Sequence, residues 1–562
     1  MIEQTNLMTE SLSSSVTRFY RSLRLSPWRA LAALIILVAV IVLISLGIRA
    51  IVQQNRSLAL LNWLNLLLIP LLLVGAALWL TNSWRRTQMD IARLRDERAM
   101  VEGYFDRLTD LLLNKNLRQA NPNDESARAA RAHTLTILRN LNAEGRGQVV
   151  RFLYESALLN AAEPIVDLQA ADLAGMDLTN VQMPAVNLRN VSLQGAQLGG
   201  VVMPASDLRE THLDGANLAQ ADLSESYLRA ASLRNAVLSE ANLRDAILTK
   251  ATFVEANLRG ADLSEANLSG ADLTRADLTG ANLKGAKLNG AIFIEAILED
   301  ADISLANLNK ANLSGVSASR ANFSGANLAG ANLTGGKLNG SVLGGAILSE
   351  ANLSDAELRD ANLNLANLRG ATLNQAILVG ANMRDAIMGR VSLSGADLSA
   401  SDLSRANLSI ANLSRAVLNR ANLEEAGLSG ADLRAAQLRG AILRGAILRG
   451  AILGDADLSR ADLTKANLRW ANLSNANLTS ADLTEVDLTD AEVSPQTLAK
   501  ARSVSKVDRP DTSHFETAPA VVVPGQSGPL PSPRTPPYQR PNADRPDGKE
   551  RQSTEEKSGD NK

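Results

Sequence analysis

The chain has 562 residues, three histidines and no cysteine, and its 57 basic and 59 acidic residues leave a net charge of −2. The absence of cysteine excludes disulfides, thiolate metal sites and cysteine nucleophiles, and the near-neutral balance implies no electrostatic partner for the whole chain. Aromatic residues make up 3% of the chain against 46% hydrophobic residues. The apolar content is therefore small or aliphatic, which is not typical of several ordinary domains.

The N-terminal part predicts a membrane anchor behind a segment of residues 1–29. Residues 30–48 form an uncharged apolar run long enough to cross a bilayer core as a helix. Residues 58–80 form a second apolar run, interrupted by Asn62, Asn65 and Pro70. A cleaved signal peptide, the alternative, has a shorter apolar region and no second span. The sequence therefore predicts a transmembrane hairpin of two helices, which would contact membrane lipid.

The arginines predict the orientation of this hairpin. Four arginines lie between residues 18 and 29 and five between 85 and 98, whereas the connection 49–57 holds two. The positive-inside rule then places both termini in the cytoplasm. We expect a multi-pass protein of the bacterial cytoplasmic membrane, with an internal membrane such as a thylakoid as the alternative.

Residues 87–163 predict an α-helical neck. Apolar residues from Ile91 to Leu112 recur at alternating spacings of three and four, the pattern of a packed helix stripe. The segment 121–124 breaks this helix and supplies caps for the next. Ordinary packing within one chain is the simpler interpretation, and a homodimer through the neck or through the spans stays open.

From residue 166 to residue 493 the sequence repeats every five residues in one unbroken frame. Of the 66 positions counted in fives from Leu168 to Val493, only Ala318 is not a large apolar residue. A small residue, usually Ala, lies two positions earlier, and Asp or Asn lies between them in most repeats. A three-residue extended segment followed by a two-residue corner explains this period. The Ala and Leu side chains then face one interior, and the polar residue between them faces water. Such units cannot bury their apolar pair alone and must stack into a β-solenoid.

These repeats resemble the A(D/N)LXX motif of the pentapeptide-repeat family, as residues 261–265 and 351–355 illustrate. The resemblance implies a right-handed quadrilateral β-helix with twenty residues in each coil, hence about 16 coils here. The narrow interior of such a coil explains the scarcity of aromatic residues. Pro184 and Pro204 depart from the motif and predict distortion in the first two coils. Examples of the predicted inward-facing core are Leu263, Leu363, Phe253, Phe293 and Phe323.

Two C-terminal segments follow the repeats. Residues 494–501 predict a helix that caps the open end, a protection that solenoids need. Residues 502–562 contain ten of the 17 prolines and many charges, which is typical of a disordered, Pro-rich tail.

No pattern in the repeats predicts catalysis. With twenty residues per coil, positions 222, 242, 262, 282, 302 and 322 stack as alternating Asp and Asn. Hydrogen bonding between stacked amides and carboxylates is a better interpretation of this column than a catalytic or calcium site. We expect no catalytic, cofactor-binding or metal-binding residue, and no enzyme.

The region around residue 440 is the candidate interface. Four consecutive repeats carry an arginine at the same outward position, so these arginines are expected to surround one coil. Three repeats carry isoleucine where Asp or Asn is usual, and these isoleucines are expected to point to different sides of the coil. Apolar residues beside basic ones favour docking of an acidic protein or of a lipid headgroup. The seven residues are Arg434, Arg439, Arg444, Arg449, Ile442, Ile447 and Ile452.

The resulting hypothesis is a membrane-anchored, non-enzymatic scaffold that presents a long cytoplasmic β-helix to an unidentified protein partner. One alternative comes from the family resemblance, because some members mimic duplex DNA and inhibit or protect topoisomerases. Residues 166–493 carry a net charge of −10, far less than duplex DNA with one charge per roughly 1.7 Å. This difference argues against the mimic and against nucleic acid as a partner. The other alternative is an accessory subunit of a membrane transport or envelope-assembly system.

Overall fold

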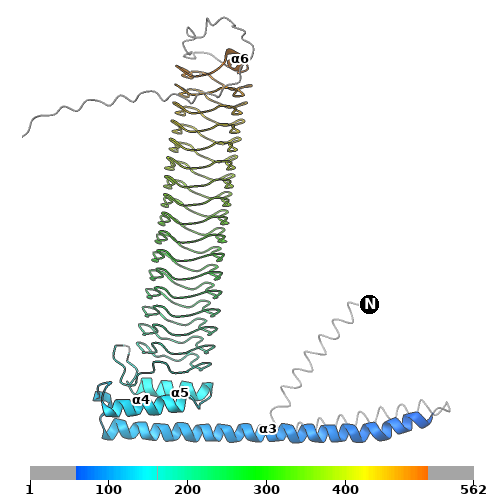
Figure 1. The fold of residues 1–562 in the computed structure, drawn as a ribbon, viewed down its shortest axis with the longest axis vertical. Coiled ribbons are helices and arrows are strands. Elements are labelled where there is room, and N and C mark those ends of the chain that lie inside the picture. The colour runs from blue at the N-terminus through cyan, green and yellow to red at the C-terminus, as the bar shows by residue number, and fades with distance from the viewer. Residues whose placement is uncertain (1–57, 161, 504–562) are drawn as a thin grey trace, which may run out of the picture. The chain divides into compact units, whose positions relative to one another are not determined.

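The computed structural model describes residues 58–160 and 162–503. Its helices are α3 (Leu58–Asn114), the 3₁₀ helix η1 (Leu117–Gln119), α4 (Glu125–Leu138), α5 (Ala143–Glu155) and α6 (Pro495–Leu498). All but α6 precede a column of stacked coils (Figure 1). The predicted N-terminal segment, the first predicted span at 30–48 and the predicted tail beyond residue 503 lie outside the described residues.

Helix α3 combines two segments that the sequence predicted as separate. It continues without a break through the second predicted span, 58–80, and through the first helix of the predicted neck. Among the residues that the structure describes, no helix has the length and apolar character needed to cross a membrane. The structure therefore does not support the predicted transmembrane hairpin.

The second half of α3 packs against α4 and α5. Val101, Tyr104 and Leu108 are at most 6% exposed in this contact. The hydroxyl of Tyr104 lies 2.7 Å from Oγ1 of Thr134, and burial raises the pKa of Tyr104 above its ordinary value. Helix α5 begins at Asn142, whose side chain accepts a hydrogen bond from N of Gly145 over 2.8 Å. The three helices thus form one small packed unit.

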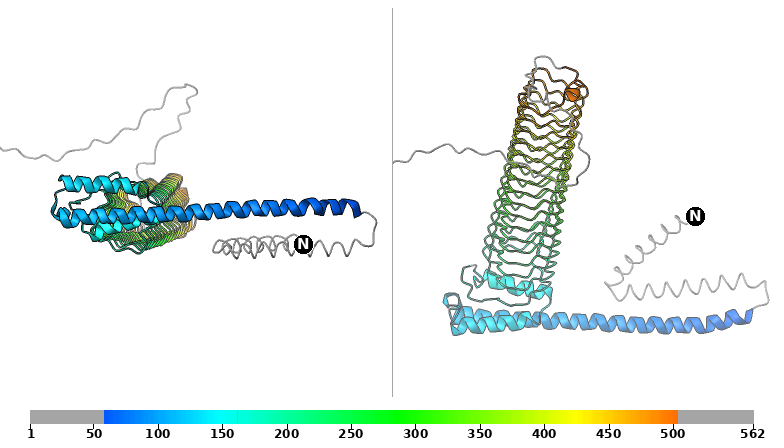
Figure 2. Two further views of the ribbon diagram at one scale, coloured as in Figure 1. Left: turned by 90° about the horizontal axis from the view of Figure 1, so that it is seen from below. Right: turned by 45° about the horizontal axis from the view of Figure 1, so that its top comes forward.

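This helical unit covers the N-terminal end of the coils, as two further views show (Figure 2). Nε of Arg131 donates to O of Asp167 over 2.8 Å, and Nη1 of Arg146 donates to O of Ala174 over 2.7 Å. A Cβ on Gly147 would lie 2.3 Å from O of Asp177, so only glycine permits this approach of α5. The neck therefore donates hydrogen bonds to exposed backbone carbonyls of the first coil and covers the interior of that coil.

Each coil contains twenty residues and has four sides. The central residue of each three-residue extended segment forms a parallel bridge to the residue twenty positions later, as in Asp262 to Asn282. Two-residue corners join the sides, and the second corner residue has a positive φ, for example +58° at Glu265. The register is unbroken from Asp172 to Glu492. The structure is therefore a quadrilateral β-solenoid.

The interior contains the two inward residues of every side. Leu263, Leu363, Phe253, Phe293 and Phe323 are all at most 1% exposed. Ala318, the one small residue at a large-residue position, is also fully buried. Its repeat immediately precedes that of Phe323, so a small and a large inward side chain lie on neighbouring sides of the coil.

The first coils do not show the predicted distortion in their bridging pattern, which has the same spacing of twenty residues as in later coils. Residues 182 and 202 bridge like their counterparts elsewhere, although Pro184 and Pro204 follow two residues later. Both prolines are the first of the two corner residues, where φ is negative and proline is favoured in β-turns. The corner therefore accommodates proline without a break in the stacking.

The C-terminal end is closed by a short helix and a returning strand. Ser494 caps α6, and its side chain accepts from N of Thr497 over 3.1 Å. The following residues then pair with the last coil: N of Ser480 donates to O of Lys500 over 2.9 Å, and N of Leu483 donates to O of Ser503 over 3.0 Å.

Candidate interaction surface

The repeat motif satisfies every backbone amide of a typical repeat. In residues 262–266, the amides of Asp262, Leu263, Glu265 and Ala266 donate to backbone carbonyls at 2.7–3.1 Å. The remaining amide, of Ser264, donates to Oδ1 of Asp262 over 3.0 Å. One backbone amide of each repeat has no carbonyl to donate to. Asp or Asn is therefore favoured at the outward position, because its side-chain oxygen accepts the hydrogen bond of this amide.

The stacked Asp and Asn residues also bond to one another. Nδ2 of Asn282 donates to Oδ1 of Asp262 over 2.9 Å, and Nδ2 of Asn322 donates to Oδ1 of Asp302 over 3.0 Å. These are the predicted contacts between stacked amides and carboxylates. Because the carboxylate oxygens hold both a neighbouring coil and their own corner, this column serves stability.

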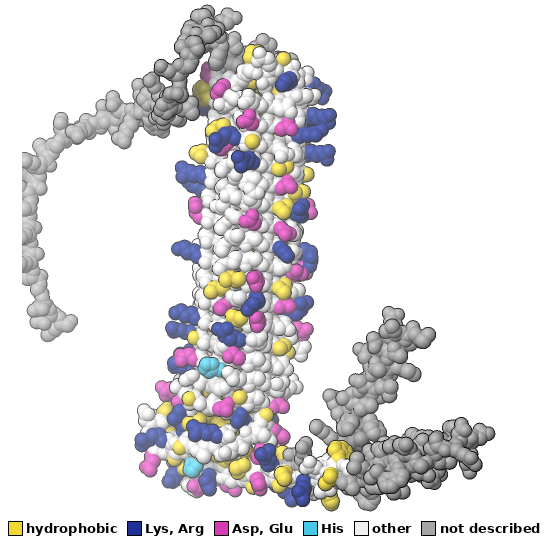
Figure 3. All heavy atoms as spheres, turned by 45° about the vertical axis from the view of Figure 1, so that its right-hand side comes forward, with side chains coloured by type: hydrophobic (Ala, Val, Ile, Leu, Met, Phe, Trp, Pro, Cys, Tyr) yellow, Lys and Arg dark blue, Asp and Glu magenta, His cyan; other side chains and the backbone are white. Residues whose placement is uncertain are grey.

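Ion pairs neutralise part of the acidic surface. Arg320 and Arg405 each form a two-pronged contact to an aspartate one coil earlier, at 2.6–2.7 Å. The hydrogen bonds from these guanidinium groups lower the pKa of Asp300 and of Asp385 below the ordinary range. Figure 3 shows one side of the molecule, on which acidic and basic side chains are mixed over most of the column and several basic ones lie together near its C-terminal end.

The four predicted interface arginines lie at four different corners of one coil. Arg434 forms an ion pair with Asp432, and the hydrogen bonds from Arg434 hold the pKa of this carboxyl below its ordinary value. Nε of Arg444 donates to Oδ2 of Asp462 over 2.6 Å. Arg439 occupies the corner between them. These arginines surround the coil, so they do not share one docking surface.

Arg449 has a different environment from the other three arginines. Its guanidinium lies 4.1 Å from the ring centroid of Trp470, and that of Arg469 lies 5.1 Å from the same centroid. Trp470 is 46% exposed at a corner one coil later. The indole and two guanidinium groups thus form a stacked cation–π cluster on the surface.

The three predicted isoleucines lie on three different sides. Ile442, Ile447 and Ile452 bridge into separate columns of outward residues. Ile447 and Ile452 are 47% and 39% exposed. An isoleucine side chain cannot accept a hydrogen bond from the corner amide two residues later, as Asp or Asn does elsewhere. The backbone amide of Arg449, which follows Ile447, therefore has no acceptor among the described residues. Of the predicted interface, the structure therefore brings together Ile447 and the arginines at its two flanking corners, Arg444 and Arg449, and places the other four residues on other sides or corners.

The exposed apolar side chains collect along one column instead. We call this column the Ile387 ladder; it joins every twentieth residue from Asn187 to Asp487. Every large apolar side chain of the β-helix that is more than 40% exposed lies on this ladder or at a corner beside it. Six of them form what we call the apolar strip: Ile347, Leu365, Ile387, Ile410, Ile447 and Trp470.

Sequence reasoning missed five of these six residues because they lie in repeats far apart in the chain. Two signals could have found them: every twentieth outward position, and apolar residues at the second corner position. Leu365 and Ile410 occupy that corner position, where glycine and polar residues dominate.

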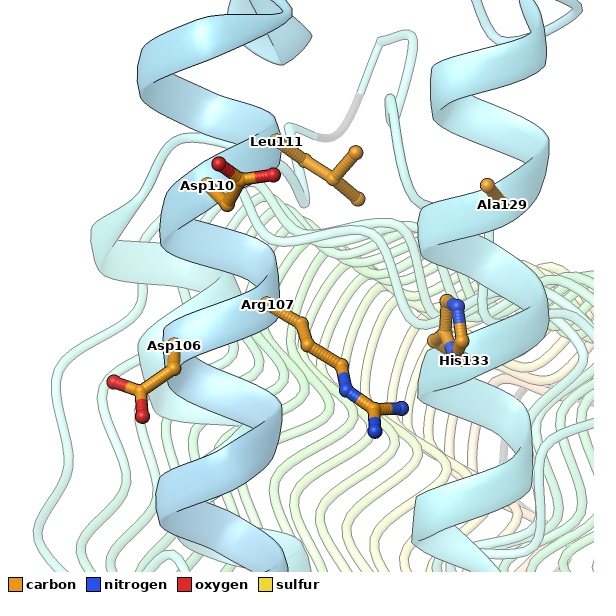
Figure 4. A pocket seen from close by; sticks show the side chains of 6 residues that line it. All are labelled: Asp106, Arg107, Asp110, Leu111, Ala129 and His133. Carbon is orange, nitrogen blue, oxygen red and sulfur yellow. The ribbon is translucent and has the colours of Figure 1, made fainter.

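A shallow cleft lies between α3 and α4 (Figure 4). Arg107 and His133 point into it from the two helices, whereas Asp106 points away. In the part of the chain that the structure describes, no three or more His, Asp or Glu side chains gather where they could hold a metal ion. The cleft is lined by Asp106, Arg107, Asp110, Leu111, Ala129 and His133.

A family model described as pentapeptide repeats matches residues 167–203, overlapping segments from 205 to 450, and 451–490, which together are more than half of the chain. No curated protein matches the chain.

Three solved structures illustrate the structural neighbours. HetL, a pentapeptide repeat protein involved in heterocyst differentiation regulation from the cyanobacterium Nostoc, is 36% identical, with 39% of this chain and 90% of HetL covered and a TM-score of 0.17. A thylakoid-lumen pentapeptide repeat protein of Arabidopsis thaliana is 33% identical, with 19% and 73% covered and a TM-score of 0.16. QnrB1, a plasmid-mediated fluoroquinolone resistance protein, is 18% identical, with 37% and 88% covered and a TM-score of 0.18. Alignments with such low TM-scores support no argument about function.

Proposed function

Because this chain belongs to the pentapeptide-repeat family of right-handed β-helices, we propose that it is a non-enzymatic scaffold whose outer surface binds proteins. One observation supports this function above the others: the inward residues fill the coils, so ligands can meet only the outside. That outside is organised into four columns whose residues recur at every coil. A stiff surface of this kind holds several contact points at constant spacing, which reduces the ordering cost of binding.

Membrane anchoring is part of the proposal and rests on the sequence. The uncharged run 30–48, the apolar run 58–80 and the flanking arginines support an anchor with both termini in the cytoplasm. Introducing an arginine into the middle of both runs, Leu37→Arg with Leu68→Arg, should release the chain from alkaline-washed membranes, whereas Leu168→Arg should not. Retention of the double variant in the membrane would contradict anchoring by these runs.

A topoisomerase-directed DNA mimic is the weaker candidate. The acidic excess is limited, and ion pairs such as Arg320 with Asp300 and Arg405 with Asp385 interrupt the negative surface. A mimic needs a continuous negative field, since duplex DNA presents one charge per roughly 1.7 Å. The mixed signs on the surface therefore favour a scaffold.

The scaffold function can be tested by photo-crosslinking of the full chain in the cells that produce it. A benzophenone amino acid replaces one exposed residue on each side: Ile387, Ile297, Val342 or Ile452. At least one side should give a protein adduct, and the same probe in a Leu363→Arg chain, whose coil is broken, should not. A chain that gives no protein adduct from any side is not a scaffold.

The same experiment separates a scaffold from an accessory subunit of a transport system. Residues 1–86 are replaced by an unrelated hairpin of two spans, and the adducts are compared with those of the native chain. A scaffold keeps its adducts because the β-helix makes the contacts. A subunit that binds a transporter through its own spans loses them.

A further inference from the structure

The apolar strip lies on the one uncharged side of the β-helix. Nine consecutive outward residues of the Ile387 ladder, from Asn307 to Asn467, carry no charge. Over the same coils, the ladder that contains Asp302 includes Asp402 and Asp462, and the ladder that contains Asp277 includes Lys337 and Glu357. The apolar strip spans seven coils, from the coil of Ile347 to the coil of Trp470. The six spacings between these coils, at about 4.8 Å each, give a length of about 29 Å.

Several apolar residues beside this ladder are held in an unfavourable backbone conformation. Leu305, Leu365, Ile410 and Trp470 are the large apolar residues at second corner positions, with φ between +57° and +60°. All four lie at the two corners that border the Ile387 ladder, and none lies at the two remaining corners. Left-handed backbone is disfavoured for bulky and β-branched residues, and glycine, alanine and polar residues occupy the other second corner positions. The four large apolar side chains are nevertheless 46–64% exposed, so burial in the folded chain does not account for them.

The corner that follows the ladder is basic. From residue 369 to residue 470 it carries four arginines and no acidic residue. Acidic residues lie at the edges of this surface: Glu350 follows Ile347 at the same corner, and Glu424 and Glu425 lie at the corner on the other side of the ladder. Three of the four arginines have no carboxylate within ion-pair distance among the described residues. The backbone amides of Gly389, Ser429 and Arg449 at this corner also have no acceptor in the described chain. The arginines are Arg369, Arg390, Arg449 and Arg469.

A second copy of this chain fits the surface poorly. A two-fold axis perpendicular to the β-helix would set the four arginines of one copy against those of the other. A two-fold axis parallel to the β-helix would set Arg449 and Arg469 of one copy beside Arg444 and Lys465 of the other. It would also set Arg390 beside Asp385, a carboxylate that is already paired with Arg405 within its own chain. Both arrangements bring like charges together, which suppresses such pairing.

A lipid surface also fits poorly. The exposed isoleucines Ile347 and Ile387 are two coils apart with Asn367 between them, so the apolar area is interrupted. The indole of Trp470, the residue best suited to a membrane interface, is covered by two guanidinium groups. Separate apolar anchors beside basic groups and free amides are the features of a surface that recognises a shaped, acidic protein.

We propose that the apolar strip and its arginine corner bind an acidic, amphipathic protein segment that lies along the Ile387 ladder. Its apolar side chains would pack between Ile347, Ile387 and Ile447. Its carboxylates would face Arg390 and Arg449 and accept from the free corner amides. This inference rests on the proposed scaffold function and names the side and the class of partner.

The test uses the full chain in the cells that produce it, with the benzophenone probe at the position of Ile387 and, as control, at that of Ile297 on another side. The Ile387 probe should give a protein adduct, and peptide sequencing should place the link in a segment with apolar residues and a net negative charge. Arg390→Glu combined with Arg449→Glu should reduce this adduct about tenfold, because both contacts become repulsive. Charge reversal at Arg415 and Arg460, which lie at the two other corners, should leave it unchanged.

The other outcomes overturn the proposal in distinguishable ways. An adduct with a second copy of the chain, with lipid or with nucleic acid would show that this molecule, and not an acidic protein, occupies the strip. Equal adducts from both probes, or an adduct insensitive to the arginine reversals, exclude a specific strip. Protein adducts from other sides but none from Ile387 refute the strip and leave the scaffold function standing. No protein adduct from any side refutes both.

Discussion

Leu363 and Leu365 provide a direct test of how the β-helix is stabilised. They are two residues apart in one repeat unit, yet Leu363 is fully buried and Leu365 is 61% exposed. Leu363 points into the coil, and Leu365 is a corner residue with a φ of +58°. Replacing each by alanine removes the same atoms from two different environments. Both replacements keep an L-residue, so the backbone strain at the corner stays nearly constant.

The expected losses differ because only one side chain fills the interior. A buried Leu→Ala substitution lowers the free energy of unfolding by about 2–5 kcal/mol, since it leaves a cavity in addition to the lost burial. Leu365 hides 39% of its surface. Of the about 1.5–3 kcal/mol that complete burial contributes, it therefore retains roughly 0.6–1.2 kcal/mol. We expect Leu363→Ala to be the more damaging change by at least about 1 kcal/mol.

Equilibrium urea unfolding of the full chain, followed by circular dichroism of the β-structure, measures this difference. Because a solenoid can unfold in sections, the midpoint and the slope of the transition are both compared with those of the native chain. Equal losses for the two variants, or a larger loss for Leu365→Ala, would refute the assignment of inward and corner positions.

Three further predictions concern packing, backbone strain and pH. Ala318→Leu should destabilise the chain by about 1–3 kcal/mol through overpacking, and Phe323→Leu in the same chain should recover part of this loss in urea unfolding; an additive double variant would exclude contact between the two sites. Ile410→Asn should raise the free energy of unfolding by about 1 kcal/mol, because Asn tolerates the left-handed corner; a loss would show that the Ile410 side chain stabilises the fold. The pKa of Asp432 is lowered chiefly by its hydrogen bond from Arg434, so its contribution is present above the ordinary pKa of about 4 and lost as the pH falls through the lower folded value. The melting temperature of Asp432→Asn should therefore approach that of the native chain in acid, and a constant difference would contradict the ion pair.

Local chemistry explains why so much of the β-helix could be predicted. The spacing of five from Leu168 onward identifies the buried residues, because a three-residue extended piece must place its first and third side chains on one face. The Asp and Asn residues were correctly placed outside and in stacked contact, as Asp262 and Asn282 show. Their bond to the corner amide, as from Ser264 to Asp262, was not anticipated. That bond depends on the φ and ψ angles of the corner, which the residue types alone do not specify.

The helical part was harder to predict because its boundaries depend on context. The pattern indicated separate helices on either side of residue 86, whereas α3 runs unbroken from Leu58 to Asn114. Nothing in an apolar run followed by a charged amphipathic stretch ends a helix, so the change in composition does not mark a boundary. The close approach of Gly147 to Asp177 also joins residues that the sequence does not connect.

By itself, the sequence determined the five-residue frame and the inward and outward positions, because each follows from chemistry within a single repeat. The family resemblance added twenty residues per coil, which the bridges between coils confirm. Only the tertiary structure decided which of the stacked side chains stay exposed and which bulky residues take the left-handed corner conformation. Ile347, Ile387 and Ile447 meet on one ladder because four corners close each coil, and Ile442 and Ile452, which are nearer to Ile447 in the chain, face elsewhere. The number of corners in a turn is set by how coils stack on one another, and a motif of five residues does not contain it.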